Sequence, residues 1–294
     1  MGFSTAIDAL PYFIMEDQGI ARKAGLTITT VPLGGGAGTI AAMAADMVDA
    51  GYVGSIPILQ AASDGLLGPT VMNVAANTFS DPSHPGGAVI VSAKVKSWKD
   101  LEGGYIAVNT PTSLGGWGIV GRLRSEGVNK YTLVDIPFEN MGLAVAGGNV
   151  TAAVMFEPFI TQSIQRGDGT ILGWVIGGPP LESIQLSVLT LRTGFVKDHA
   201  AAAKALVGAH VQAVRWLLGH EKAARALVGK GLSIPATVTA DMRLLQWRAD
   251  CRNDPAIWQS TQATVVGLGL LNKAILPSAL YDETLLDAAL KALR

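Results

Sequence analysis

Short apolar runs alternate with amphipathic runs along the first part of the chain. The first 80 residues predict strands and helices in alternation, with helices at 11–18, 38–47 and 57–64 and strands at 26–31, 48–53 and 70–76. Such alternation is typical of a parallel sheet whose strands are joined by crossover helices. The sequence therefore predicts an α/β fold rather than an all-helical or all-β fold.

The pattern continues after a turn-rich break at 80–87. Further strands are predicted at 88–92, 105–108, 131–135, 151–156, 170–176 and 185–191, and further helices at 115–126 and 138–146. Beyond Phe195 we expect helices throughout, at 197–219, 221–229, 239–250, 255–270 and 279–293. The strands near 88–92 and 186–191 would carry the chain between two lobes and back, as a double crossover that acts as a hinge.

One local pattern occurs in both halves of this array. A glycine-rich loop at 34–39 opens an alanine-rich helix, and a Gly/Ser/Thr loop at 109–116 opens another. Downstream of these loops, Val48-Asp49-Ala50 corresponds to Val150-Thr151-Ala152. Two lobes of similar build, each with loops rich in hydrogen-bond donors at its strand ends, suggest a ligand held between them.

Composition narrows the function classes. The 294 residues are 49% hydrophobic and only 15% charged, which excludes a disordered chain and leaves room for two cores. The net charge is -1 and the basic residues form no stripe, so we expect no nucleic-acid partner. No uninterrupted apolar run is long enough for a membrane span.

Metal and thiol chemistry find little support in the sequence. Cys251 has no second cysteine to pair with and no nearby His and Asn that would mark a nucleophile, so we expect a packed, inert side chain. The four histidines, His84, His199, His210 and His220, form no metal pair with Asp or Glu. We expect no metal site, no cofactor and no catalytic residue.

Several short motifs in register resemble one protein family across roughly residues 6–200. They are Leu10-Pro11-Tyr12, Gln18-Gly19-Ile20, Ala24-Gly25-Leu26, Asp49-Ala50-Gly51 with Ser55 and Pro57, Trp98 to Gly103 with Ile106-Ala107-Val108, and Glu157-Pro158-Phe159. This order and spacing is similar to that of the solute-binding proteins for nitrate, sulfonates, taurine and thiamine precursors. One departure is that the first strand is nearly absent here.

The resemblance implies a type II periplasmic-binding-protein fold, with two α/β lobes joined by a two-strand hinge and a helical C-terminal tail. We expect residues 1–87 and 190–294 to form one lobe and 88–189 the other. The implied function is capture of a small solute for the membrane permease of an ABC transporter, by a monomer in the periplasm or another extracytoplasmic space. A signal peptide is not visible at Met1-Gly2-Phe3-Ser4, and we expect the natural chain to begin earlier.

Loops at the carboxyl ends of the strands would line the cleft, because open α/β sheets bind ligands there. In this sequence those loops are 4–10, 34–39, 54–56, 77–80, 109–116 and 156–159. The candidate ligand-binding residues are Asp8, Leu10, Tyr12, Gly35, Gly36, Ser55, Asn77, Asn109, Thr112, Ser113, Gly115, Trp117, Phe156, Glu157 and Phe159. None of these loops contains Lys or Arg, so an anion would rely on N–H and hydroxyl groups, or the ligand is neutral or zwitterionic.

Each candidate also has a purely structural interpretation. Glu157 accepts hydrogen bonds from an amine-bearing ligand or braces the lobe interface, and Asp8 binds ligand or caps the helix that starts near Leu10. The aromatic residues sandwich a flat ligand or pack in the cores. The loop at 34–38 is a ligand contact or only a tight turn, and it lacks the Lys-Ser/Thr of a phosphate-binding loop.

Two other function classes stay open. An enzyme on the same fold, similar to menaquinone-pathway enzymes or pyrimidine synthases, would need an acid, base or cofactor residue in the cleft, and only Glu157 and Asp8 qualify. The pyrimidine synthases carry a cysteine cluster, whereas this chain has one Cys. A ligand-sensing domain would bind its ligand in the same way but signal to a partner chain.

Overall fold

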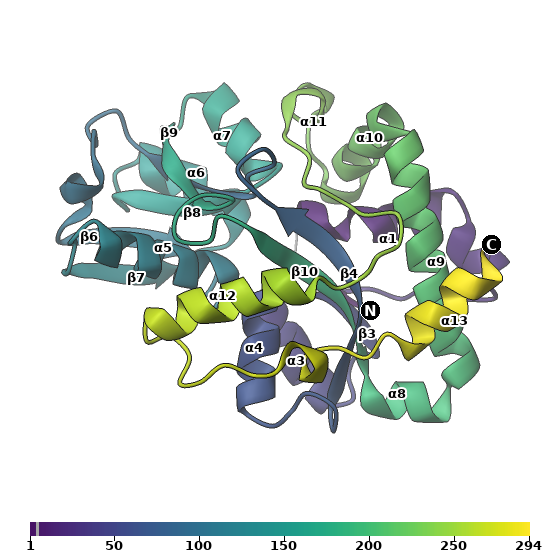
Figure 1. Ribbon diagram of the computed structural model, residues 1–294. Coiled ribbons are helices and arrows are strands. Elements are labelled where there is room, and N and C mark those ends of the chain that lie inside the picture. The colour runs from purple at the N-terminus through teal and green to yellow at the C-terminus, as the bar shows by residue number, and fades with distance from the viewer. Residues whose placement is uncertain (4–5) are drawn as a thin grey trace.

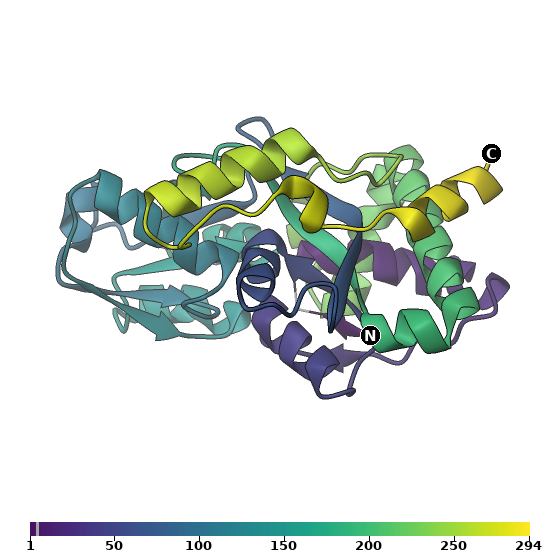
Figure 2. The ribbon, with the colours of Figure 1, turned by 60° about the horizontal axis from the view of Figure 1, so that its bottom comes forward.

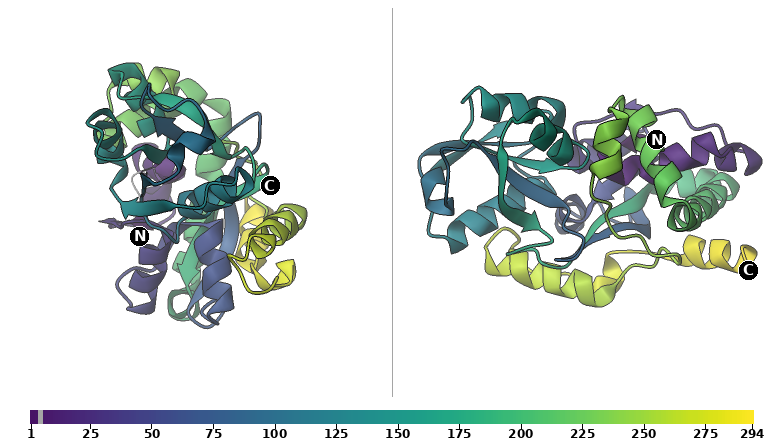
Figure 3. Two further views of the ribbon diagram at one scale, coloured as in Figure 1. Left: turned by 90° about the vertical axis from the view of Figure 1, so that its left-hand side faces the viewer. Right: turned by 90° about the horizontal axis from the view of Figure 1, so that it is seen from above.

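Two five-stranded sheets form the centres of two lobes in this computed structural model, which describes residues 1–3 and 6–294 (Figure 1). The first sheet has the order β2-β1-β3-β10-β4 and the second the order β7-β6-β8-β5-β9. We call the first sheet with its helices lobe 1 and the second with its helices lobe 2. The two lobes lie side by side when the molecule is seen from above (Figure 3).

The strands of lobe 1 come from two parts of the sequence, one before and one after the segment that forms lobe 2. They are β1 (Gly2–Phe3), β2 (Val31–Pro32), β3 (Ala50–Gly54), β4 (Val71–Ser80) and β10 (Ile184–Arg192). Strand β1 pairs parallel to β2 and β3, whereas β10 lies antiparallel between β3 and β4. The predicted strand at 26–31 is largely wrong. On this side of the sheet the short strand β1 offers partners only to Val31 and Pro32 of β2.

Lobe 2 repeats this design. Its strands are β5 (Gly87–Val91), β6 (Gly104–Val108), β7 (Tyr131–Asp135), β8 (Ala152–Phe156) and β9 (Thr170–Ile176). Strands β7, β6 and β8 are parallel, and β5 lies antiparallel between β8 and β9. The antiparallel strands are β10 in lobe 1 and β5 in lobe 2. Each is the first strand that the chain forms after it crosses over from the other lobe.

The helices of the first two thirds mostly connect strands, as their alternation predicts. They are α1 (Leu10–Asp17), α2 (Ile20–Lys23), α3 (Gly36–Ala44), α4 (Ser55–Ser63), α5 (Leu114–Ser125), α6 (Phe138–Ala146) and α7 (Phe159–Arg166), with 3-10 turns η1 (Ile7–Ala9) and η2 (Trp98–Leu101). Five of them, α3, α4, α5, α6 and α7, begin shortly after a strand, so their N-termini lie at the carboxyl edges of the sheets. These edges face each other across the gap between the lobes.

Two short segments connect the lobes. Residues 81–86 lead from β4 to β5, and residues 177–183 lead from β9 back to β10. The first segment is held beside the start of the second, because the Gly86 N–H donates to the carbonyl of Ile176, the last residue of β9, at 3.0 Å. Strand β10 pairs entirely within the first sheet, although the expected lobe 2 range of 88–189 would divide it.

The C-terminal third is helical apart from one extended segment. Its helices are α8 (Thr193–Asp198), α9 (Ala200–Gly219), α10 (Glu221–Leu232), α11 (Ala236–Asp241), α12 (Pro255–Gly267) and α13 (Thr284–Ala292), with a 3-10 turn η3 (Pro277–Ala279). Helix α12 reaches from lobe 1 toward α5 of lobe 2 (Figure 2). Within the described residues, no helix combines the length and apolar character needed to cross a membrane.

The predicted helix at 239–250 is wrong. Helix α11 ends at Asp241, and residues 242–254, which we call the connecting arm, run without a helix along the edge of β4. The Phe79 N–H donates to the Gln246 carbonyl at 2.8 Å, and the Gln246 N–H donates back at 3.1 Å. These bonds give backbone groups of the arm hydrogen-bond partners in the sheet, so the arm does not need the hydrogen bonds of a helix.

Candidate ligand-binding cleft

A cavity lies between the lobes where the carboxyl edges of the two sheets meet. The cavity is open to solvent. Lobe 1 and the connecting arm contribute one wall and lobe 2 the other, through Ala6, Ile7, Asp8, Gly35, Gly36, Tyr52, Gly54, Pro57, Leu186 and Leu245 on one side and Asn109, Ser113, Leu114, Gly115, Phe138 and Phe156 on the other. A ligand in this cavity would touch both lobes at once.

The glycine loop of lobe 1 brings backbone directly to the cavity. Gly35 has φ 138° and ψ -172°, a conformation that essentially only glycine adopts, and it is the N-cap of α3 without a side-chain cap. A Cβ on Gly36 would lie 2.8 Å from Cγ of Pro57, so glycine is also needed for packing there. The first N–H groups of α3 have no partner within the helix and, at its positive end, favour a ligand oxygen.

Lobe 2 presents a second helix start at the cavity. Ser113 is the N-cap of α5, and its Oγ accepts a hydrogen bond from the Gly116 N–H at 3.1 Å. Leu114 and Gly115, the first two residues of α5, line the cavity, and helix geometry gives their N–H groups no intrahelical partner. A Cβ on Gly115 would lie 3.1 Å from Cγ1 of Val154, so this helix packs closely against β8.

Aromatic rings form the apolar part of the lobe 2 wall. Phe138, the first residue of α6, meets Phe156 edge to face with ring centroids 5.6 Å apart. On its other side Phe138 stacks on Phe159 at 6.1 Å. Phe138 and Phe156 line the cavity and Phe159 supports them from behind, so the wall offers a preorganised apolar surface.

Among the described residues that line the cavity, only Asp8 has a charged side chain. It is only 8% exposed, and its Oδ1 has no hydrogen-bond partner among the residues that the structure describes. Burial raises the pKa of Asp8 to about 7, and the backbone N–H groups of Asp8 and Ala9 oppose that shift only in part. The Asn77 amide holds the loop by donating from Nδ2 to the Asp8 carbonyl at 2.8 Å. Helix α1 itself has Ala9 as its N-cap.

A buried polar chain supports the floor of the cavity. The Tyr52 hydroxyl and His210 Nδ1 are 3.1 Å apart, and His210 Nε2 lies 3.1 Å from the Ala76 carbonyl. A carbonyl only accepts, so Nε2 carries the proton and Nδ1 accepts from Tyr52. Burial lowers the pKa of His210 to about 4, which keeps the ring neutral.

Polar contacts join the lobes around the cavity. The Ile7 N–H of lobe 1 donates to the Glu157 carbonyl of lobe 2 at 3.2 Å. Asn109 Nδ2 of lobe 2 donates to the Gly34 carbonyl of lobe 1 at 3.4 Å. The structure therefore has the lobes in contact, in a closed arrangement.

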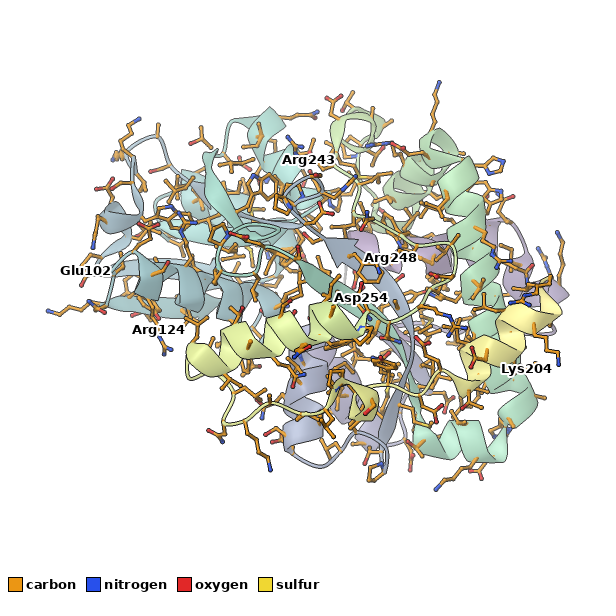
Figure 4. All side chains as sticks on the ribbon, viewed as in Figure 1. Glu102, Arg124, Lys204, Arg243, Arg248 and Asp254 are labelled. Atoms are coloured by element: carbon orange, nitrogen blue, oxygen red, sulfur yellow. The ribbon has the colours of Figure 1, made fainter. Side chains whose placement is uncertain are left out.

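The Glu157 side chain turns away from the cavity. Its carboxylate accepts from the Thr161 N–H at 3.1 Å, from Thr161 Oγ1 at 2.9 Å and from the Arg243 N–H at 3.0 Å. Arg243 belongs to the connecting arm and lies near α7 (Figure 4). Burial raises the pKa of Glu157, and these hydrogen bonds oppose the shift. The contacts match the interpretation of Glu157 as a brace of the lobe interface.

The expected site residues divide into two groups. Those that line the cavity are Asp8, Gly35, Gly36, Asn109, Ser113, Gly115 and Phe156. Those that do not line it are Leu10, Tyr12, Ser55, Asn77, Thr112, Trp117, Glu157 and Phe159. Of this second group, Leu10 and Trp117 are in the cores, Tyr12 packs against Phe3 and Phe13, and Thr112 is exposed. Residues 4–5 of the expected loop 4–10 lie outside the described residues.

Some lining residues lie outside the loops expected from the sequence, namely Tyr52, Pro57, Phe138, Leu186 and Leu245. Phe138 could have been found, because it follows β7 and opens α6, which is the same strand-end rule that selected Gly115. Tyr52 and Leu186 lie within strands, and Leu245 lies on the connecting arm. No local sequence signal marks those three.

Comparison with known proteins agrees with this geometry. Two α/β lobes around a cleft, joined by two crossovers, define the type II periplasmic-binding-protein fold. The chain belongs to the NMT1-like family, whose model matches residues 1–233. No curated protein matches the sequence.

Several solved structures share the fold at low sequence identity. The alkanesulfonate-binding protein SsuA from Xanthomonas axonopodis pv. citri, bound to MOPS, is 18% identical with a TM-score of 0.75, covering 96% of both chains. The periplasmic nitrate-binding protein NrtA from Synechocystis PCC 6803 is 15% identical with a TM-score of 0.78, covering 100% of this chain and 88% of its own. A DszB variant in complex with biphenyl-2-sulfinic acid is 18% identical with a TM-score of 0.68, covering 99% of both.

Proposed function

We propose that this protein is the solute-binding component of an ABC importer, and that it captures a small organic solute by closure of its lobes. The observation that carries this proposal is the cavity lined from both lobes, with the starts of two helices on its wall. The structural neighbours from Xanthomonas and Synechocystis are binding proteins for an alkanesulfonate and for nitrate. They support the class of function for this chain.

The cavity wall favours an organic ligand over a small inorganic ion. Phe138 and Phe156 offer an apolar surface, and the helix starts of α3 and α5 offer N–H donors to an oxygen-bearing group. Sulfonates, taurine-like solutes, aminopyrimidines and aromatic acids all combine such parts. Nitrate has no apolar body, so it is the least suitable of these ligands.

Closure would couple binding to recognition by the permease. A ligand that touches both lobes stabilises the closed arrangement, because only then are both sets of contacts made. The two crossovers at 81–86 and 177–183 would act as the hinge. We place the protein in the periplasm or another extracytoplasmic space, as a monomer, with the membrane permease as its partner.

A thermal-shift screen tests the proposal. The probes are alkanesulfonates, taurine, nitrate, aminopyrimidines and aromatic acids, and a ligand that binds only the folded state raises the melting temperature. We expect a shift with one organic class, and a smaller radius of gyration for the protein with that ligand in X-ray scattering. A lack of any shift across the panel would argue against solute capture.

An enzyme on the same fold is the second candidate, and the position of Asp8 favours it. A carboxyl group whose pKa is raised to about 7 within a cavity is suited to proton transfer at neutral pH. If the protein is an enzyme, the solute that raises the melting temperature would be converted on incubation, which mass spectrometry detects. Recovery of unchanged solute would favour the binding protein, or a sensor that uses the same cleft.

A further inference from the structure

The cavity wall carries two electrostatically different kinds of group. One is Asp8, whose Oδ1 is buried without a partner among the described residues. The other is the backbone N–H groups of Gly36, Leu114 and Gly115 in the first turns of α3 and α5, which have no partner within their helices. No Lys or Arg side chain is among the described residues that line the cavity. A buried carboxylate without a partner is costly, so a cationic or N–H-rich group placed against it would be strongly favoured.

A plain anion fits this arrangement poorly. The N–H groups of Gly36, Leu114 and Gly115 would attract it, but the ionised Asp8 in the same cavity would repel it. A ligand with N–H donors at Asp8 and an oxygen acceptor at the helix starts would satisfy both kinds of group. Ile7, Phe156 and Leu245 also line the cavity and are suited to contact with an apolar linker.

A surface hollow beside the cavity is also negatively charged. This hollow shares Asn109 and Phe138 with the cavity, and its described lining includes the carboxylates of Asp135 and Glu139 and no Lys or Arg. Both acidic residues are exposed. An approaching cation would therefore meet negative charge outside the cavity as well as inside it.

We propose that the ligand of this cleft carries a protonated amine or amidine that pairs with Asp8, and an oxygen-bearing acceptor group that meets the N-termini of α3 and α5. Asp8 is then the residue that selects ligands with this cation over otherwise identical ligands without it. This inference rests on the proposed function, since it names the chemistry of the captured solute.

Most of the other titratable groups near Asp8 keep one protonation state between pH 6 and 8. Tyr52, on β3, has its pKa raised well above its usual range by burial, with smaller contributions from the nearby Cys251 and Asp8. Burial raises the pKa of Cys251 to about 12 and lowers that of His210 to about 4. Glu157 follows β8, and its carboxylate is held by Thr161 and Arg243. Burial raises the pKa of Glu157 as well, so changes in binding between pH 6 and 8 that persist in Glu157→Gln would report on Asp8.

Matched probe pairs test the proposal by calorimetry on the whole chain. One pair is 3-aminopropanesulfonate and propane-1-sulfonate, and the other is 4-(aminomethyl)benzoate and 4-methylbenzoate. In at least one pair we expect the amine to bind about 10 to 100 times more tightly, as for a hydrogen bond to a charged group. In Asp8→Asn this preference should disappear, while the Asn109→Ala variant should weaken both members of a pair alike.

The pH dependence on the unmodified protein gives a second measurement, in case Asp8→Asn does not fold. Binding of an amine should strengthen from pH 6 to pH 8, as Asp8 loses its proton, and binding of the amine-free partner should weaken. Equal or tighter binding of the amine-free probes would overturn this inference and leave the proposed solute capture intact. Binding by none of the four probes would overturn it as well, and the broader thermal-shift panel would then decide separately on solute capture.

Discussion

The backbone N–H of Ile7 donates to the carbonyl of Glu157 at 3.2 Å, and this bond joins lobe 1 to lobe 2 beside the cavity. Both partners are main-chain atoms, so most side-chain substitutions leave the bond intact. Ile7 precedes Asp8, and Glu157 follows Phe156, which means that the contact fixes two lining residues relative to each other. One backbone hydrogen bond therefore joins the lobes and positions two lining residues at the same time.

Gly35→Ala should impair closure. The conformation of Gly35 disfavours any side chain, and an added Cβ would lie 2.9 Å from Nδ2 of Asn109 on the opposite lobe. We expect a loss of about 1–3 kcal/mol, shared between stability and ligand affinity. Calorimetry with the best thermal-shift ligand and X-ray scattering of the bound form measure it.

Gly34→Ala is the matched control for this substitution. An added Cβ at Gly34 has no heavy atom within 4 Å, and its backbone is not in the positive-φ region. This variant should bind and close like the unmodified protein. If both variants bind normally, the glycine loop does not control closure.

Glu157→Gln should lower stability more than affinity. The carboxylate accepts three hydrogen bonds from Thr161 and Arg243, and an amide cannot accept all of them. We expect the free energy of unfolding to fall by about 1–3 kcal/mol. Urea denaturation measures this change, and Glu182→Gln on the exposed surface serves as the control. Lost affinity with unchanged stability would instead show that Glu157 contacts the ligand.

His210 should make the protein sensitive to mild acid. Its folded pKa of about 4 is below the usual imidazole value of about 6.5, so its contribution to stability is complete above pH 6.5 and is lost as the pH falls toward 4. The slope is at most about 1.4 kcal/mol per pH unit. Urea denaturation of the unmodified protein and of His210→Gln at pH 7, 6 and 5 should give a stability difference that narrows in acid. Parallel curves would contradict a neutral buried ring.

Asp8 should have the opposite effect to His210 on the pH dependence of stability. Its pKa rises from the usual carboxyl value of about 4 to about 7 on folding, so the folded protein holds this proton more tightly than the unfolded chain. Stability from this group is therefore present below about pH 4 and is lost as the pH rises through 7. Without ligand, Asp8→Asn should gain stability relative to the unmodified protein across this window. A stability difference that stays constant from pH 4.5 to 8 would count against the raised pKa.

The fold was largely predictable because buried strands in α/β proteins appear as short apolar runs between helices. The two lobes, their strands and the helix that starts near Gly115 follow from that pattern. The connecting arm could not be predicted in the same way, because its extended form depends on Phe79, which is far away in the sequence. The segment at 26–31 alternates like a strand, but β1 offers it too few residues to pair with.

The cavity was predictable where it is built from strand-end loops. Gly35, Asn109 and Gly115 were found because glycine and short polar residues cluster after strands. Tyr52 and Leu186 were not, since only the sheet register decides which strand residues face the cleft. Leu245 reaches the cavity through the connecting arm, which is a tertiary placement without a local signal.

The position of β10 has a consequence for the order in which the molecule assembles. β10 lies between β3 and β4, yet the ribosome makes it only after all five strands of lobe 2. During synthesis lobe 2 can complete its sheet first, while β3 and β4 wait with unpaired edges that are open to wrong partners. The half of the protein that is made first is therefore the half that finishes folding last.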